Sequence, residues 1–428
     1  MGRRTVSDIC LSGLLNYRKI KTNSLVSNQE DEMGEQESKT VAANQQPLSV
    51  ALGLAPAIRE HAAEAEQERR LPEELARDMA RSGLHKLASP TYANGTERDP
   101  LTQIKVIEAV SEADGSTGWN LMIGMEVQGF AAAAFPPERA LQLFGDPEII
   151  ISGALNPLGR ATIEDGGIRV NGIWPMASGC HNSDYFWGQC ILVDDDGKFK
   201  RAKAGQVQLR EVLALTYEVE ILDTWKSSGM CGSGSHDVKI TDLFIPDDRV
   251  TRVTEQKPFA NTSLFRIPTY SRLAYNKFAV ASGIARAAIG HFKTLACEKK
   301  PRSTSALLCE RTDAQRAIAE AETCLRSARA FVFESVSEVW MATEEGRSVS
   351  AESRALLQLA CSSGVQSACK AVDRMCAASG VNVIYSDSLL GRCQRDIHVV
   401  PQHITVSPQW TEAAGRVLFG LASEVPIL

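Results

Sequence analysis

Two histidines near the C-terminal end are the residues of this chain best suited to move a proton. His398 and His403 lie within six residues of each other, in the segment Arg395–His403, and the whole chain of 428 residues has only seven histidines. The ordinary pKa of an imidazole is about 6.5, so modest changes in its surroundings decide which protonation form dominates. No glutamate occurs between Asp396 and Glu412. The candidate acid or base of this segment is therefore a histidine and not a glutamate.

Hydroxyl groups gather in two glycine-containing stretches earlier in the chain. Ser178 follows the run that begins at Trp174, and the second stretch is the Gly-Ser-Gly-Ser sequence of residues 232–235. A serine at the end of a strand can bond a bound ring, and backbone N–H groups of a short turn can face a phosphate or ring oxygen. Each stretch is equally compatible with an ordinary turn. For the neighbouring His181 and His236 we expect a capping role.

The pattern of apolar residues predicts which elements must position these groups. Helical spacing covers residues 48–145, including one helix over 51–83 that ends at a Ser-Gly pair. Residues 146–260 form short runs bounded by Gly, Asp and Pro, which predict a compact antiparallel β-barrel or sandwich. Residues 261–428 read as long amphipathic helices and predict a four-helix bundle. The expected helices there cover about 273–297, 308–344, 351–378 and 387–403, with a final turn over 411–421.

Residues 1–47 differ in composition from the rest of the chain. They are basic up to residue 22 and acidic from 30 to 38, with few large apolar side chains. Such a segment cannot bury enough surface to offset its ordering entropy, so we predict a disordered tail. Two alternatives stay open: residues 1–28 loosely fit a transit peptide, and Met33 could be the true start.

Bulk properties exclude several classes of function. A net charge of −6 gives no electrostatic case for binding nucleic acid or an anionic membrane. No apolar run approaches the roughly 18–20 residues of a membrane span. The eleven cysteines form no CxxC pair and no zinc-like cluster, so we expect reduced thiols, no metal site and a cytoplasmic location.

Four stretches, in the expected order, resemble the acyl-CoA dehydrogenase fold over about residues 50–428. They are residues 114–124, 174–184, 223–246 and the Arg-Asp-Ile-His segment at 395–398. The resemblance implies an α+β protein with an all-α N-terminal domain (48–145), a central β domain (146–260) and a C-terminal four-helix bundle (261–428). Dehydrogenases of this fold carry a catalytic Glu in the turn after the Arg-Asp pair, and this chain does not. The chain therefore looks more like the monooxygenases of the superfamily.

The resemblance also implies roles for individual residues. Ser178 matches the serine that bonds flavin N5, and His403 and, as a weaker match, His398 correspond to the histidine over the reactive face. A substrate cavity shaped by Trp119, Asn120 and Met122 is implied as well. Further cofactor contacts implied by the family are Trp225, Ser233, Ser235, Arg311, Gln315 and Arg395. The stretch 376–381 lacks the Gln and the first Gly of the dehydrogenases' FAD-binding segment, which suits an enzyme that borrows reduced FAD or FMN.

The chemistry implied by this branch is oxygen transfer. Reduced flavin adds O2 at C4a to give a hydroperoxide. This adduct survives only in a dry cavity, where the protein supplies a hydrogen bond to flavin N5 and a controlled proton donor. The expected protein is the oxygenase component of a two-component monooxygenase, a homotetramer served by a separate NAD(P)H:flavin reductase, acting on a small aromatic or heterocyclic substrate. Two alternatives are an acyl-CoA dehydrogenase-like enzyme with a relocated base, such as Glu108 or Glu112, and a non-catalytic flavin- or partner-binding scaffold.

Overall fold

The computed structural model of the chain describes residues 25–302 and 304–423. Residues 1–45 and residues 46–428 form two separate units, and the second is described below. Of the predicted tail, residues 1–24 lie outside the described residues, and residues 25–47 belong to helix α1 (Leu25–Glu68).

The N-terminal region of the second unit is helical, as the sequence predicts. The end of α1 is followed by α2 (Glu73–Arg81), α3 (Pro100–Ala113), α4 (Gly115–Ala134) and α5 (Pro137–Phe144). The single helix expected over 51–83 is in fact two helices. Arg69 adopts a φ of +53°, and Pro72 precedes α2, so the chain leaves the helical path between them.

The β region is one open, mixed sheet of seven strands, whereas the sequence predicts an antiparallel barrel or sandwich. The strands are β1 (Ile151–Glu164), β2 (Gly167–Ala177), β3 (Tyr185–Leu192), β4 (Leu209–Leu215), β5 (Glu220–Leu222), β6 (His236–Pro246) and β7 (Val250–Thr251), in the order β5-β6-β2-β1-β3-β4-β7. Because β2 reverses the chain and β3 returns on the far side of β1, β1 and β3 run parallel.

The end of β2 is irregular at the point that matters for function. The pairing of β2 with β6 shifts between Trp174 and Ala177. Within that shift Met176 has a φ of +59° and is 65% exposed. A bulge of this kind re-aims the residues that follow it, and strained non-glycine backbone is concentrated at functional sites. Here the bulge directs the chain to Ser178.

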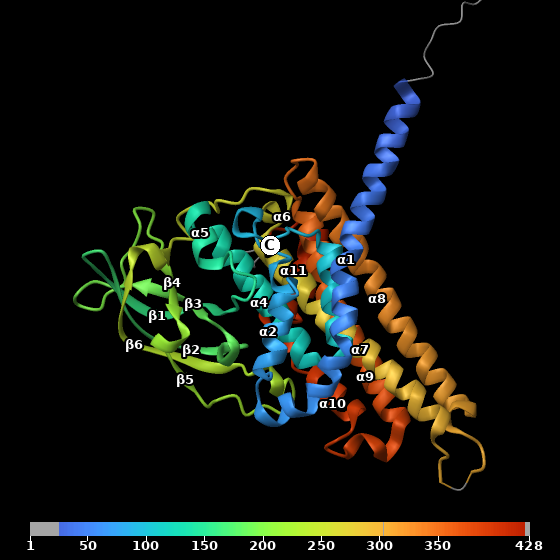
Figure 1. The fold of residues 1–428 in the computed structure, drawn as a ribbon. Coiled ribbons are helices and arrows are strands. Elements are labelled where there is room, and N and C mark those ends of the chain that lie inside the picture. The colour runs from blue at the N-terminus through green and yellow to red at the C-terminus, as the bar shows by residue number, and fades with distance from the viewer. Residues whose placement is uncertain (1–24, 303, 424–428) are drawn as a thin grey trace, which may run out of the picture. The chain divides into compact units, whose positions relative to one another are not determined.

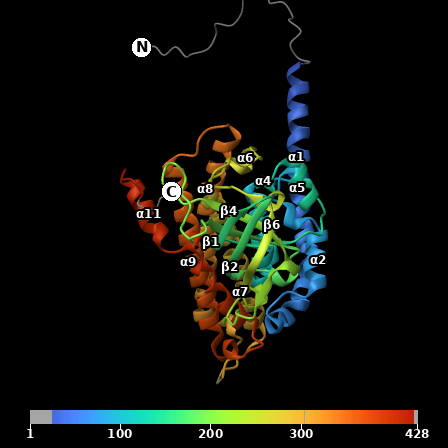
Figure 2. The ribbon, with the colours of Figure 1, turned by 90° about the vertical axis from the view of Figure 1, so that its left-hand side faces the viewer.

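The C-terminal region is a bundle of long helices. After the short α6 (Ser263–Arg266) come α7 (Thr269–Glu298), α8 (Thr312–Glu344), α9 (Ala351–Ser379), α10 (Leu389–Ile397) and α11 (Gln409–Leu418). In this bundle α9 packs against both α7 and α8, and α7 also packs against α3. Figure 1 shows the sheet to one side of α4 and α5 and the bundle to the other, and Figure 2 shows the sheet in front of the bundle.

The helix predicted over 387–403 ends early. The last residue of α10 is Ile397, and two 3₁₀ turns follow, over Val400–Gln402 and Ile404–Val406. Pro401 has no amide hydrogen to donate to the carbonyl of Ile397, so it cannot continue the α-helix. His403 therefore lies on an irregular segment and not on the helix that carries Arg395.

A buried carboxyl connects the end of this bundle to the rest of the fold. Asp396 on α10 is buried, and its Oδ1 accepts a hydrogen bond from the backbone N–H of Met230 at 2.6 Å. Its Oδ2 lies so close to Gly115, the first residue of α4, that a Cβ there would stand 3.0 Å away. Burial, and the nearby Asp114, raise the pKa of Asp396 from 3.8 to about 7.

This raised pKa predicts a specific pH dependence of stability. The folded protein holds the Asp396 proton up to about pH 7, whereas the unfolded chain releases it near 3.8, so this group destabilises the fold as pH rises through that window. Asp396→Asn keeps an acceptor for the Met230 N–H but cannot ionise. We expect its free energy of unfolding, measured with urea across the same pH range, to fall less with pH than that of the wild type. The exposed Asp195→Asn is the control; parallel curves for Asp396→Asn and the wild type would contradict the assignment.

Candidate functional site

Trp119 joins two of the predicted catalytic residues. Its indole Nε1–H donates to the hydroxyl of Ser178 at 3.1 Å. The same ring meets the imidazole of His403 edge-on, with 5.9 Å between ring centroids and an interplanar angle of 67°. Trp119 lies in the first turns of α4, and Asp114 caps this helix by accepting the N–H of Thr117. The helix start therefore fixes the position of the indole.

Ser178 belongs to a short chain of buried hydroxyl groups. Its Oγ lies 2.7 Å from the Oγ of Ser235, which in turn lies 2.7 Å from the Oγ of Ser233. The backbone joins the same two turns, because the N–H of Gly179 donates to the carbonyl of Ser233 at 2.9 Å. The 232–235 turn thus contributes hydroxyl groups to this site, while the backbone N–H groups of Ser233 and Gly234 donate to the carbonyls of Met230 and Cys231.

Asn120 connects α4 to the same turn. Its side-chain Nδ2 donates to the carbonyl of Gly232 at 3.2 Å, while its Oδ1 is buried without a protein partner. Of the predicted site residues, the structure brings Trp119, Asn120, Ser178, Ser233, Ser235 and His403 together.

His403 is held in one tautomer by its own backbone turn. Its Nδ1 accepts hydrogen bonds from the backbone N–H of Thr405 at 3.3 Å and from the Thr405 hydroxyl at 2.9 Å. An acceptor nitrogen carries no proton, so the ring hydrogen is on Nε2. Burial, together with the nearby Lys277 ammonium, lowers the pKa of His403 to about 3. At neutral pH the residue is therefore a neutral hydrogen-bond donor through Nε2–H.

A buried ion pair lies on the helices beside His403. Lys277 of α7 pairs with Glu126 of α4, and the amide of Asn276 donates to the other Glu126 oxygen at 3.0 Å. Burial raises the pKa of Glu126 and lowers that of Lys277. The sequence analysis missed this pair. Its only signal was one charged residue in each of two strongly apolar stretches, since Asp, Glu and Lys are rarely fully buried unless paired.

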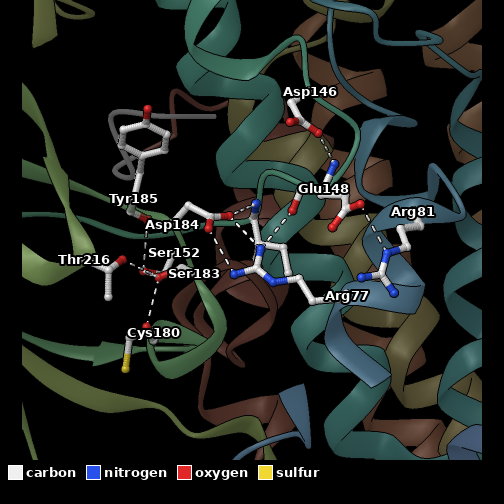
Figure 3. Close-up of polar contacts among 11 residues, drawn as sticks. Arg77, Arg81, Asp146, Glu148, Ser152, Cys180, Ser183, Asp184, Tyr185 and Thr216 are labelled. Atoms are coloured by element: carbon white, nitrogen blue, oxygen red, sulfur yellow. Dashed lines mark hydrogen bonds and ion pairs between the residues drawn. The ribbon is translucent and has the colours of Figure 1, made fainter. Parts of the chain in front are cut away.

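Polar contacts hold the turn after β2 against its neighbours, including α2, as Figure 3 shows. The guanidinium of Arg77 on α2 donates to both carboxylate oxygens of Asp184, at 2.8 and 3.0 Å. Asp184 Oδ2 also accepts the N–H of Ile150 at 2.8 Å. Next to it, Ser183 Oγ donates to the carbonyl of Cys180 at 3.0 Å and lies 2.9 Å from Ser152 Oγ. Bidentate Arg–carboxylate bonds are geometrically specific, so α2 and the turn after β2 keep a fixed spacing.

Other predicted residues lie outside this cluster. His398 is 51% exposed at its side chain, with Nε2 at 2.9 Å from Asp373 on the neighbouring helix α9. Arg311 pairs with Asp313 at the exposed start of α8, where Gln315 donates to the carbonyl of Cys309. The structure does not bring His398, Arg311 and Gln315 to Ser178, and their roles stay predictions.

The last three predicted residues have structural roles: two make polar contacts and one is buried in the core. Trp225 Nε1 donates to the carbonyl of Met230 at 3.0 Å, next to the 232–235 turn. Arg395 forms an ion pair with Glu66 of α1. Met122 is fully buried in the helical core. The described residues contain no cluster of three or more His, Cys, Asp or Glu able to hold a metal, and no helix within them is long and apolar enough to cross a membrane.

Comparison with known proteins assigns the chain to a family. The N-terminal domain of acyl-CoA dehydrogenase matches residues 51–136, and the C-terminal domain of acyl-CoA dehydrogenase matches residues 277–408. The chain belongs to the acyl-CoA dehydrogenase family.

Within this family the chain is similar to flavin-dependent monooxygenases. Indole-3-acetate monooxygenase from Pseudomonas putida is 29% identical over 358 residues, covering 83% of this chain and 89% of the relative. The oxygenase subunit HsaA of a flavin-dependent monooxygenase from Rhodococcus jostii (strain RHA1) is 26% identical over 367 residues, covering 83% and 93%. The structure of XiaF from Streptomyces sp., in complex with FADH2 and glycerol, has a TM-score of 0.83 at 23% identity, covering 92% of this chain and 100% of XiaF.

The tautomer of His403 can be tested directly. Thr405→Val removes the hydroxyl that donates to Nδ1 and leaves the backbone N–H in place. The lost bond is worth about 0.5–1.5 kcal/mol, enough to populate the other tautomer measurably. We expect the ¹⁵N chemical shifts of the His403 ring to move toward the Nδ1–H form in Thr405→Val and to stay constant in the exposed control Thr294→Val. Unchanged shifts in Thr405→Val would show that the hydroxyl does not set the tautomer.

Proposed function

We propose that this chain is the oxygenase component of a two-component flavin-dependent monooxygenase. It takes reduced FAD or FMN from a separate NAD(P)H:flavin reductase and uses O2 to hydroxylate a small aromatic or heterocyclic substrate. One oxygen atom enters the substrate and the other leaves as water, while the two electrons come from the reduced flavin. The observation that carries the proposal is the neutral His403, held with its proton on Nε2 beside the Trp119–Ser178 pair.

The residues around Ser178 fit a flavin ring. Ser178 is a neutral hydroxyl with two protein partners, which leaves one further bond for a ring nitrogen. The exposed Met176 next to it offers apolar surface of the kind that a flat ring system covers. Bound reduced flavin would supply the activation of O2; the chain's own part is to bond the ring edge through Ser178 and to shield it with Trp119.

His403 has the properties required of the proton donor in this proposal. Its Nε2–H is a donor, and its low pKa keeps it neutral, so no imidazolium is present to release a proton early. The indole of Trp119 lies edge-on to its ring, with 5.9 Å between the ring centroids, and so covers one side of it. We assign His403 a hydrogen bond from its Nε2–H to the oxygen atom that is transferred to the substrate.

The dehydrogenase alternative has less support from the geometry. Glu108, a candidate for a relocated base, is bonded through both oxygens to Arg329 at 2.9–3.2 Å and also accepts from Ser282 at 2.7 Å. Both oxygens of this carboxylate are therefore engaged in bonds to side chains of α8 and α7. The second candidate, Glu112, lies on the same helix α3, and its side chain is exposed to solvent and not enclosed in a site. We also propose that this chain assembles as a homotetramer, which is the oligomeric state expected from the fold.

The proposed activity can be tested with purified protein and a generic flavin reductase. We expect consumption of O2 with NADH and flavin, release of hydrogen peroxide when substrate is absent, and a gain of one oxygen atom in the mass of the accepted aromatic compound. Bleaching of bound oxidised FAD by an acyl-CoA would identify a dehydrogenase instead. Failure to bind either reduced FAD or reduced FMN would favour a non-catalytic scaffold.

The role of His403 gives a sharper prediction. In His403→Ala we expect the fraction of oxygen released as hydrogen peroxide to rise by about tenfold or more, because one positioned proton donor typically contributes 10²–10⁴-fold. The dissociation constant for reduced flavin should change little. His403→Gln, which retains an N–H donor, should recover part of the coupling, and the surface variant His61→Ala serves as the control. An unchanged peroxide fraction in His403→Ala would remove His403 from the mechanism.

A further inference from the structure

A small, partly open cavity is lined by Ser178 together with buried residues that the proposed function does not use. Its volume is about 20 Å³, and its walls come from α2, α4, the start of β1 at Ile151 and the turn after β2. The residues that line it and bear on the argument are His85, Asn120, Gly124, Ser178 and Gly179. A cavity needs roughly 10–15 Å³ to hold a water molecule, so this one has room for one.

Two polar side chains that line this cavity carry buried atoms without a protein partner. His85 is 4% exposed, and neither of its ring nitrogens has a hydrogen-bond partner in the described residues. The Oδ1 of Asn120 is likewise buried and unpaired, although its Nδ2 is bonded to the carbonyl of Gly232. Buried polar groups are nearly always satisfied by protein or by ordered water, and leaving them unpaired costs free energy. Both residues line the same cavity, so one water can serve both.

The neighbouring backbone is adapted to the imidazole ring. Gly124 lies inside α4, where a glycine weakens the helix. A Cβ at this position would stand 3.1 Å from both Cε1 and Nδ1 of His85. Glycine therefore leaves the space that the ring occupies, at a cost in helix stability. Burial, with a smaller contribution from Arg77, lowers the pKa of His85 to about 4, so the ring is neutral and has both a donor and an acceptor nitrogen.

We propose that this cavity holds one ordered water molecule bonded to His85 and to Asn120 Oδ1, and that His85 is a positioning residue for the flavin-edge serine. This inference rests on the proposed function for its catalytic consequence. The water fixes the orientation of the Asn120 amide, which holds the Gly232 carbonyl and with it the turn that carries Ser233 and Ser235. That turn holds the hydroxyl of Ser178 through Ser235.

The water bonds Asn120 and not Ser178 for a simple reason. A serine hydroxyl makes about three hydrogen bonds, one as donor and two as acceptor. Ser178 has one from Trp119 and one with Ser235, which leaves a single position for the flavin. Asn120 Oδ1 has both of its acceptor positions free of protein partners and lies near Gly179, where a Cβ would be 2.8 Å from it. His85 therefore supports Ser178 only indirectly, through the water, Asn120 and the 232–235 turn.

The first test is structural and does not depend on enzyme activity. A high-resolution crystal structure of the wild type should show one ordered water within hydrogen-bond distance of His85 and Asn120 Oδ1. In His85→Phe, which fills similar space without ring nitrogens, the density should be absent and the Asn120 amide should rotate. An empty cavity in the wild type would overturn the proposal.

The second test uses three variants and reads flavin affinity and coupling. His85→Phe and Gly124→Ala should both weaken binding of reduced flavin by about fivefold to tenfold, as expected for loss of one hydrogen bond, and raise the peroxide fraction. His85→Gln, which restores a donor and an acceptor, should recover most of both. The control for the added methyl group is Gly290→Ala, because a Cβ at this exposed helical glycine meets nothing within 4 Å.

The outcomes separate this inference from the proposed function. If Gly124→Ala behaves like Gly290→Ala, or if His85→Phe matches the wild type in flavin affinity, His85 has no positioning role. If the wild type forms no oxygenated product from reduced flavin, O2 and the aromatic compounds supplied, the proposed function fails. The ordered water and the flavin affinities then still decide whether His85 positions the site.

Discussion

The buried carboxyl of Asp396 is the constraint on which the assembly of this protein's site depends. It accepts the N–H of Met230 ahead of the 232–235 turn, and it faces Gly115 at the start of α4. Three segments that are distant in sequence must therefore meet at one buried point. Removing a carboxyl from water is costly unless it gains partners, so the contact forms only when all three segments are in place. The elements that carry Trp119, Ser233 and Ser235 are thereby brought to a common junction.

The remaining polar contacts fix the positions of the helices and turns around this junction. The Arg77–Asp184 pair fixes α2 against the turn that carries Ser178, and Asn120 ties α4 to the turn at Gly232. These are directional bonds between irregular segments, which have no regular hydrogen-bond ladder to hold them. A loop site is precise only when a rigid scaffold and such bonds support it. The sheet and the bundle supply the scaffold here, and buried side-chain bonds supply the precision.

Sequence reasoning predicted the α–β–α order, because motif order and spacing survive in a single chain. The resemblance to the family pointed to Ser178, Ser233, Ser235 and His403, which the structure brings close together, and their roles stay predictions. Sequence reasoning could not predict the parallel pairing of β1 with β3, since strand order in a sheet depends on contacts between distant segments. It also missed the Lys277–Glu126 pair and the cavity beside His85, whose members lie on different elements. The helix expected over 387–403 was wrong at Pro401, although the missing amide hydrogen of proline was visible in the sequence and its consequence was not drawn.

The bond from the Thr405 backbone N–H to His403 has a consequence for how the proposed enzyme would spend its reducing equivalents. A neutral imidazole is a very weak acid, so it gives up its Nε2 proton only when a strongly basic oxygen develops next to it. Such a donor cannot release its proton before the reaction produces this basic oxygen. On the proposed function, proton delivery would wait for oxygen transfer to the substrate, and electrons from NADH would not be lost as peroxide in the interval. The turn at Thr405 would then act as a safeguard against futile turnover.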